Sequence, residues 1–284
     1  MIAFSTQIWI SLVISVLAGV IVTIVVLLTR ILFYYVRDLL PAGSLFSGIR
    51  NASNNCMIFI RRMTDLEQSG RYLSPTPNYS PISKDSKIQY SAQFKKNQNI
   101  PWVTSTATAM AMAHILNVLG RIGRSENIEI TYHDKDYERW DSPMIIIGGG
   151  WKAHRALKTC NPYYQLQPNG FTLISSGEAF PPKCDEEDIG LLEKMINPTN
   201  NQPIWLIHGY RGAGVVSASY ALVRWWRYLG WIYGKKPFAL LVSFNDRDGW
   251  QQSNIISLYP KPNWFTKLIH PHSWHKLKNM IKRR

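Results

Sequence analysis

The chain has 284 residues, a formal net charge of +14 and 46% hydrophobic residues. This is enough chain to bury an ordinary core, which excludes a minimal fold that depends on disulfides or metals. The three cysteines (Cys56, Cys160 and Cys184) have neither the paired spacing of zinc sites nor the density of a disulfide framework, so a reducing compartment is expected.

The first element is an apolar segment. Residues 1–29 carry no charged side chain, and the run from Ile8 to Leu28 is almost wholly apolar. About 20 such residues span a hydrocarbon core of about 30 Å, so residues 1–37 are predicted to be a transmembrane anchor. A secretory signal peptide is the alternative interpretation, but it would show a basic start, a shorter apolar core and a small-residue cleavage site.

The basic residues near this segment all follow it: Arg30, Arg37, Arg50, Arg61 and Arg62. Basic residues within about 15–20 positions of a span favour the cytoplasmic side. We therefore expect a single-pass protein of the inner (cytoplasmic) membrane, with its N-terminus outside and its soluble domain in the cytoplasm.

Residues 38–100 are predicted to be a juxtamembrane region and linker. The part up to residue 65 is expected to be partly helical, with the apolar stretch before Met63 packing on the membrane or on the domain. Residues 66–100 are rich in Ser, Pro, Asn and Lys without sustained periodicity, which is typical of a linker.

Residues 101–260 alternate between predicted helices and strands. Helices are expected at 104–119, 151–158 and 215–228, and strands at 127–133, 144–147, 171–174, 204–207, 238–244 and 255–259. The acidic cluster at 185–188 precedes a helix-like segment, where its charge would suit the helix dipole. The expected fold class is α/β: an N-terminal transmembrane helix plus a Rossmann-like three-layer domain with a mostly parallel sheet.

Two glycine-rich turns follow predicted strands, at 148–150 and 209–214. Ligands of open α/β sheets bind beyond the carboxyl ends of the strands, where glycines admit a ligand to backbone N–H groups and a helix N-terminus favours an anion. We therefore predict an anionic ligand, with a nucleotide as one form of it, near these predicted binding residues: Gly148, Gly149, Gly150, His154, Asn197, Asn200, Gly209, Arg211, Gly212, Gly214 and Ser217.

Catalytic candidates are few. Asp188, His208 and Asp246 are the acid–base residues that an enzyme would use here. The chain lacks the G-x-S-x-G nucleophile elbow of α/β-hydrolases and the G-x-x-x-x-G-K-[ST] phosphate loop. The sequence identifies no metal site and no cofactor.

The order of these motifs resembles a poorly characterised prokaryotic α/β domain of archaeal surface-layer-type proteins and bacterial regulators. An Ala-rich helix is followed by Gly148-Gly149, by Asp188-x-Gly190, by Asn197-Pro-Thr-Asn200 and by the glycine turn. The resemblance implies a fold and a pocket but no reaction. The Asn expected after Gly-Gly and the Thr expected after the last glycine are absent, which implies that any ligand binding of the family is altered or lost here.

Residues 261–284 form a basic, aromatic, amphipathic tail in which seven Lys or Arg and no acidic residue follow Asp248. This composition is typical of a segment that lies on an anionic bilayer, and the predicted anchor makes us favour the lipid bilayer over nucleic acid as its partner. The leading hypothesis is a membrane-anchored sensor or effector module in bacterial signalling or defence. The alternatives are a membrane-bound enzyme acting on a nucleotide or sugar phosphate, and a non-catalytic scaffold. The oligomeric state stays open.

Overall fold

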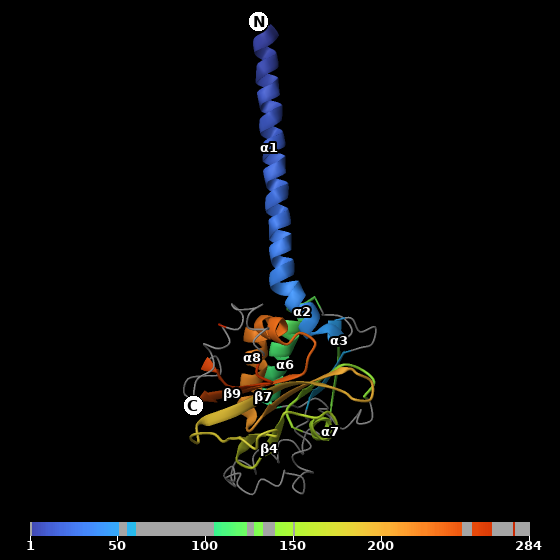
Figure 1. Cartoon of the computed structure of the whole chain (residues 1–284), viewed down its shortest axis with the longest axis vertical. Helices are drawn as coiled ribbons and strands as arrows, with labels where there is room; N and C mark the ends of the chain where they lie inside the picture. Colours follow the sequence, from blue (N-terminus) through green and yellow to red (C-terminus); the bar gives the residue numbers. More distant parts are fainter. Residues whose placement is uncertain are drawn as a thin grey trace, which may run out of the picture.

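The structure is a computed structural model that describes residues 2–50, 56–60, 105–123, 128–132, 140–149, 151–245, 252–262 and 275. The expected linker at 66–100 and nearly all of the basic tail lie outside the described residues. Figure 1 shows a long N-terminal helix that extends from a domain of strands and helices.

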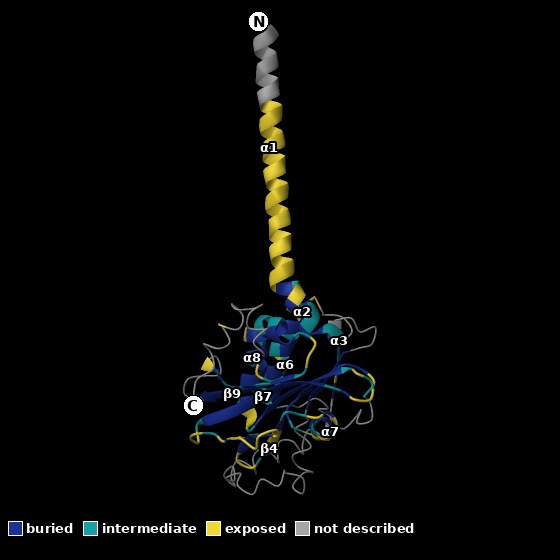
Figure 2. Cartoon of the chain, in the orientation of Figure 1, coloured by how far each residue is buried: buried dark blue, intermediate teal, exposed yellow. Residues whose placement is uncertain are grey.

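Helix α1, Ile2–Tyr34, is the apolar segment expected from the sequence. It extends for roughly 50 Å at 1.5 Å per residue, and its described side chains, from Leu12 onward, are exposed (Figure 2). The helix is long and apolar enough to cross a membrane. A single π-helical turn, η1 (Tyr35–Leu39), joins it to α2 (Leu40–Leu45), which α3 (Ser47–Arg50) follows.

The main sheet has seven strands in the order β10-β9-β7-β8-β3-β1-β2. Its strands are β1 (Cys56–Ile60), β2 (Ile128–Tyr132), β3 (Met144–Ile147), β7 (Glu187–Ile196), β8 (Pro203–Gly209), β9 (Phe238–Asn245) and β10 (Asn254–Tyr259). Strands β2, β1, β3 and β8 pair in parallel, whereas β7 pairs antiparallel with both β8 and β9. The fold is therefore α/β with a large mixed sheet in which most strands run one way, as expected.

Strand β7 corrects one expectation, because a helix-like segment was predicted after the acidic cluster. Its ten residues are buried on both faces except at the last position, and they include Glu193 and Lys194 at 0% and 1% exposure. Ile189, Leu192 and Met195 are three residues apart, so their apolar spacing imitates a helix. A central strand with buried charges does not show the alternation by which strands are recognised.

Strand β1 corrects the expected domain boundary. Cys56–Ile60 was assigned to the juxtamembrane region, but it lies between β3 and β2 in the parallel part of the sheet. All five of its residues are buried. The α/β domain thus begins before residue 101, and α2 and α3 belong to its packing.

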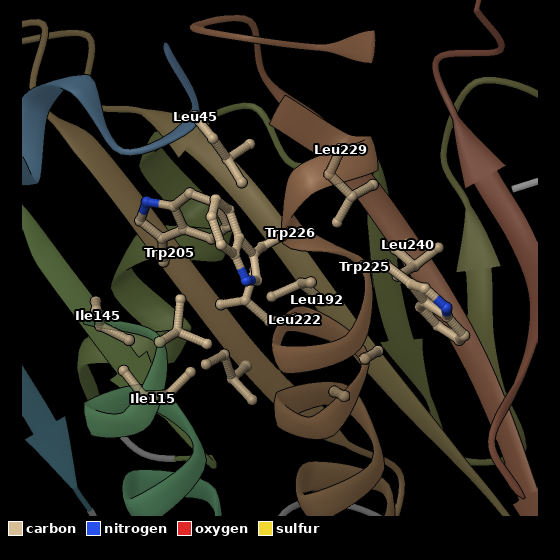
Figure 3. Packing of buried hydrophobic residues seen from close by; sticks show 14 of the residues in the cluster. Leu45, Ile115, Ile145, Leu192, Trp205, Leu222, Trp225, Trp226, Leu229 and Leu240 are labelled. Carbon is tan, nitrogen blue, oxygen red and sulfur yellow. The ribbon is translucent and has the colours of Figure 1, made fainter. Parts of the chain in front are cut away.

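Two hydrophobic clusters lie on opposite faces of the sheet. Helices α2, α6 (Thr106–Arg121) and α8 (Gly212–Ile232) cover one face, where Trp205, Trp225 and Trp226 are buried (Figure 3). On the other face, residues of α7 (Trp151–Thr159) pack with a small antiparallel sheet of β4 (Tyr164–Gln167), β5 (Gly170–Leu173) and β6 (Ala179–Phe180). Alternate residues of each central strand enter the two clusters.

The elements that follow α1, from η1 to α3 (residues 35–50), are called the juxtamembrane segment below, and they pack directly on helix α8. A Cβ at Gly230 of α8 would lie 2.5 Å from the carbonyl oxygen of Pro41, so the two backbones are in contact. The Ser44 hydroxyl donates to the Gly230 carbonyl oxygen at 3.1 Å, and the buried Asp38 carboxylate forms an ion pair with Arg227. Helix α1 is therefore joined to the domain by a packed segment with its own ionic contact.

The contact at Gly230 gives a test of this packing. We expect Gly230→Ala to lower the free energy of unfolding by about 1–3 kcal/mol, because the new methyl group must push α2 away from α8. Gly120→Ala is the matched control, since a Cβ on that helical glycine of α6 meets nothing within 4 Å. Denaturant unfolding of the full chain in detergent measures both variants, and equal stability of the two would contradict the proposed backbone contact.

Candidate functional site

The predicted ligand end of the sheet is formed by β3 and β8, which are parallel neighbours with Ile147 opposite Ile207. Gly148 follows β3 with φ +80°, and its N–H donates to the Ile207 carbonyl oxygen at 2.8 Å. A Cβ on Gly149 would lie 3.4 Å from Nε2 of His208. The structure therefore brings together Gly148, Gly149 and His208, which come from two separate turns of the sequence.

Two helices begin at this end. Helix α6 is capped by Ser105, whose hydroxyl accepts the Thr108 N–H at 3.1 Å. A Cβ on Gly212, the first residue of α8, would lie 3.4 Å from Cβ of Ala107. The positive ends of α6 and α8 are thus adjacent, next to the glycine bend at 148–149.

The N-terminus of α8 is already occupied by a carboxylate of the chain itself. Oδ1 of Asp188 accepts the Arg211 N–H at 2.9 Å, and Oδ2 accepts the Gly214 N–H. Oδ1 also accepts the Ile189 N–H at 2.8 Å. Asp188 therefore takes the place in which the sequence analysis expected the anionic group of a ligand.

Burial raises the pKa of Asp188, while the hydrogen bonds from Gly214, Arg211 and Ile189 oppose that rise. The side chain is 2% exposed, so its oxygens are separated from solvent. These contacts favour a positioning role over acid–base catalysis for Asp188. It fixes the turn between β8 and α8 by satisfying N–H groups that the helix leaves without partners.

Glycines in the turn at 209–214 and on β7 allow the backbones to pack closely. A Cβ on Gly190 would lie 2.1 Å from the Gly214 carbonyl oxygen, and one on Gly214 would lie 2.3 Å from the Ile189 carbonyl oxygen. A Cβ on Gly209 would lie 2.4 Å from the Val215 nitrogen. The Asp-x-Gly segment and the glycine turn thus fit one another: Asp188 caps α8, and the glycines let its first turn touch β7 and β8.

Asp188 and His208 lie on opposite faces of the sheet. Leu191 is paired with His208, and residues of one strand alternate between faces, so Asp188 points toward α8. His208 lies on the other face, where its ring meets Phe171 edge-on at 6.2 Å. The two catalytic candidates are not brought together, and the third candidate, Asp246, lies outside the described residues together with Gly150.

The Asn-Pro-x-Asn motif lies at the other end of β8. Asn197 and Asn200 both donate side-chain N–H groups to the Trp140 carbonyl oxygen, and their Oδ1 atoms accept the Thr199 and Gln202 N–H groups. Strand β8 separates this turn from Gly209 by seven residues, or roughly 20 Å. The two asparagines therefore form a structural turn and do not share a pocket with the glycine bend.

The remaining predicted residues divide between surface and core. Arg211 and His154 are exposed, and Nη1 of Arg211 donates to the Asp185 carbonyl oxygen. Ser217 is fully buried in α8, and its hydroxyl is 2.9 Å from that of Ser253. Of these three residues, Arg211 and His154 are accessible to a ligand.

Sequence reasoning missed the most unusual side chains of β7. Glu193 is fully buried, its Oε1 accepts the Tyr163 N–H, and burial raises its pKa to about 8. The next residue, Lys194, faces the opposite side, and burial lowers its pKa to about 7. Neither residue stands in a motif, so the only available signal was a charged pair within an apolar run.

Comparison with known proteins adds no assignment. No protein-family model matches the chain, and no curated protein matches it. Among the described residues, no cluster of three or more His, Cys, Asp or Glu side chains could hold a metal ion.

The capping role of Asp188 can be tested by removing its oxygens. We expect Asp188→Ala to lower the free energy of unfolding by about 2–4 kcal/mol, because the Arg211 and Gly214 N–H groups lose their acceptor inside the protein. Asp185→Ala is the matched control, since it removes the same charge from an exposed neighbour. Urea unfolding compares the two, and a loss confined to ligand binding, with unchanged stability, would make Asp188 a ligand contact instead.

Proposed function

We propose that this chain is a membrane-anchored sensor or effector module whose α/β domain binds an anionic small ligand at the carboxyl ends of β3 and β8. The expected Rossmann-like, three-layer arrangement and the resemblance to prokaryotic regulators form part of this proposal. A cytoplasmic domain on an inner-membrane anchor, with a role in signalling or defence, is proposed with it. The basic tail is proposed to lie on the bilayer.

The observation that carries the proposal is the position of helix α8. Its first residue, Gly212, lies at the predicted ligand end, and its last turns hold Arg227 and Gly230 against the juxtamembrane segment. The helix has 21 residues, or a length of roughly 30 Å. One continuous helix therefore connects the candidate site with the anchor, which suits a protein that reports ligand binding to the membrane.

The geometry also narrows how a ligand would bind. Asp188 fills the first turn of α8, so the anionic group is assigned to the bend at Gly148 and Gly149, with the exposed Arg211 at the N-cap of α8 as its proposed cationic contact. The separation of Asp188 from His208 supports a binding module over an enzyme that uses both residues. A nucleotide is the first ligand class to examine, since open α/β sheets bind such ligands at this end.

A ligand panel tests the binding site. A nucleotide that binds should raise the melting temperature of the full chain in detergent. A nucleotide concentration of about 100 times Kd adds about 2.7 kcal/mol to the free energy of unfolding. Arg211→Gln should raise by about tenfold the nucleotide concentration that is needed for the same shift, because a charge-assisted contact is lost. Arg224→Gln is the control on the same helix, and loss of the shift in both variants, or no shift with any nucleotide, contradicts the proposal.

The orientation of the domain is tested by cysteine labelling. Cys184 is exposed, whereas Cys56 and Cys160 are buried, so Cys184 should account for nearly all labelling of the folded chain. A membrane-impermeant maleimide should label it only after the cells are opened, and Cys184→Ser should abolish the signal. Labelling of Cys184 in unbroken cells would place the domain on the outer side and contradict the proposed cytoplasmic location.

A further inference from the structure

A second site lies away from the ligand end, where the juxtamembrane segment meets the sheet. A cavity of about 260 Å³ is lined by eight residues, of which two are lysines, Lys194 and Lys235. Ser47, Asn201 and Gln202 add polar side chains, and no acidic residue is among the lining residues. A cavity with two lysines and no carboxylate has the charge of an anion site when both lysines are protonated.

Lys194 is held in place by one carbonyl group at the end of α2 and one just after α8. Its Nζ donates to the carbonyl oxygen of Leu45, the last residue of α2, at 2.7 Å and to that of Gly234 at 3.0 Å. The ammonium group lies 5.6 Å from the centre of the Trp205 ring. An ammonium group has three N–H donors, so these two hydrogen bonds leave a third donor and the positive charge.

The location of the cavity connects it with the membrane. Ser47 and Gly48 belong to α3, and α2 and α3 lie at the end of the domain from which α1 extends (Figure 1). A Cβ on Gly48 would lie 2.3 Å from Cγ of Pro203, so α3 is packed tightly on the start of β8 at this wall. With α1 in a bilayer, the cavity would lie on the membrane-proximal side of the domain.

We propose that this cavity binds a phosphate group, with Lys194 and Lys235 as its cationic ligands. Its volume is just below the range of about 300–1,000 Å³ typical of small-molecule sites, which suits a phosphate with a small substituent. The same chemistry is offered by the headgroup of an anionic phospholipid and by a soluble phosphate compound. This site is separate from the ligand end, and the proposal for it does not depend on the proposed sensor function.

The experiment uses the full chain in nonionic detergent and isothermal titration calorimetry. The probes are inorganic phosphate and dihexanoyl phosphatidylglycerol below its micelle concentration, with dihexanoyl phosphatidylcholine as the zwitterionic reference. Lys235→Gln should weaken binding by about tenfold, because one charge-assisted contact is lost. Lys236→Gln is the matched control, since it removes the same charge from an exposed neighbour that does not line the cavity.

Each outcome decides between named alternatives. Binding of both anionic probes, weakened in Lys235→Gln alone, supports a phosphate site, and binding of phosphatidylglycerol alone identifies the bilayer as its source. Binding of inorganic phosphate alone identifies a soluble compound. Equal effects of the two substitutions, no effect of either, or no binding in the wild type overturns the proposal.

A pH series adds a readout that a purely structural lysine would not give. Burial, followed by the charge of Lys235, lowers the pKa of Lys194 to about 7, and Lys235 is the other charged residue among the described groups that line the cavity or contact Lys194. A bound anion favours the charged ammonium, so affinity should be highest below pH 7 and fall as the pH rises above it. Sulfate, whose charge is constant over this range, should bind about tenfold more weakly at pH 9 than at pH 6, and equal affinity would contradict the assignment of Lys194.

Discussion

The fold depends on how closely the backbone of α8 approaches its neighbours. At the start of the helix a Cβ on Gly214 would lie 2.3 Å from the Ile189 carbonyl oxygen, and near its end one on Gly230 would lie 2.5 Å from that of Pro41. Between these points Trp225 and Trp226 are buried against the sheet. Small residues at both ends and large ones in the middle fix α8 over the sheet and allow the juxtamembrane segment to pack on it. The position of helix α1 thus follows from that of α8.

The close contact between the backbones of α8 and β7 also explains why a glycine-rich turn need not bind an external anion. The first turn of α8 presents N–H groups without partners and the positive end of the helix dipole. A buried carboxylate from the adjacent strand accepts hydrogen bonds from these N–H groups and places a negative charge at the positive end. Asp188 supplies it, with Gly190 two residues later leaving room for the helix. A sequence pattern of glycines before a helix predicts an anion at this place, but it does not tell whether the anion comes from a ligand or from the chain.

Most of the element pattern could be predicted from the sequence, because the continuous apolar runs 144–147 and 204–207 are typical of buried strands and the stretch near 106–121 has the composition of a packed helix. β1 was missed because its five buried residues stand alone between the anchor and a polar stretch, without a neighbouring turn motif. β7 was missed because Glu193 and Lys194 break its apolar pattern. The bend at Gly148 and its neighbour His208 could be predicted from strand ends, whereas the separation of Asp188 from His208 depends on the register of an antiparallel strand, which no local pattern encodes.

Buried charged side chains help to set the direction of helix α1. Asp38 forms an ion pair with Arg227 on α8, and Lys194 on β7 donates a hydrogen bond to the last carbonyl of α2, so a charged side chain fixes each end of the stretch 38–45 to the domain. A buried ion pair adds little net stability when compared with well-packed apolar groups, yet removing one of its partners typically costs about 3–5 kcal/mol. These contacts therefore penalise other placements of α2 more than they stabilise this one. Any shift of α8 over the sheet must break these contacts or carry α1 with it.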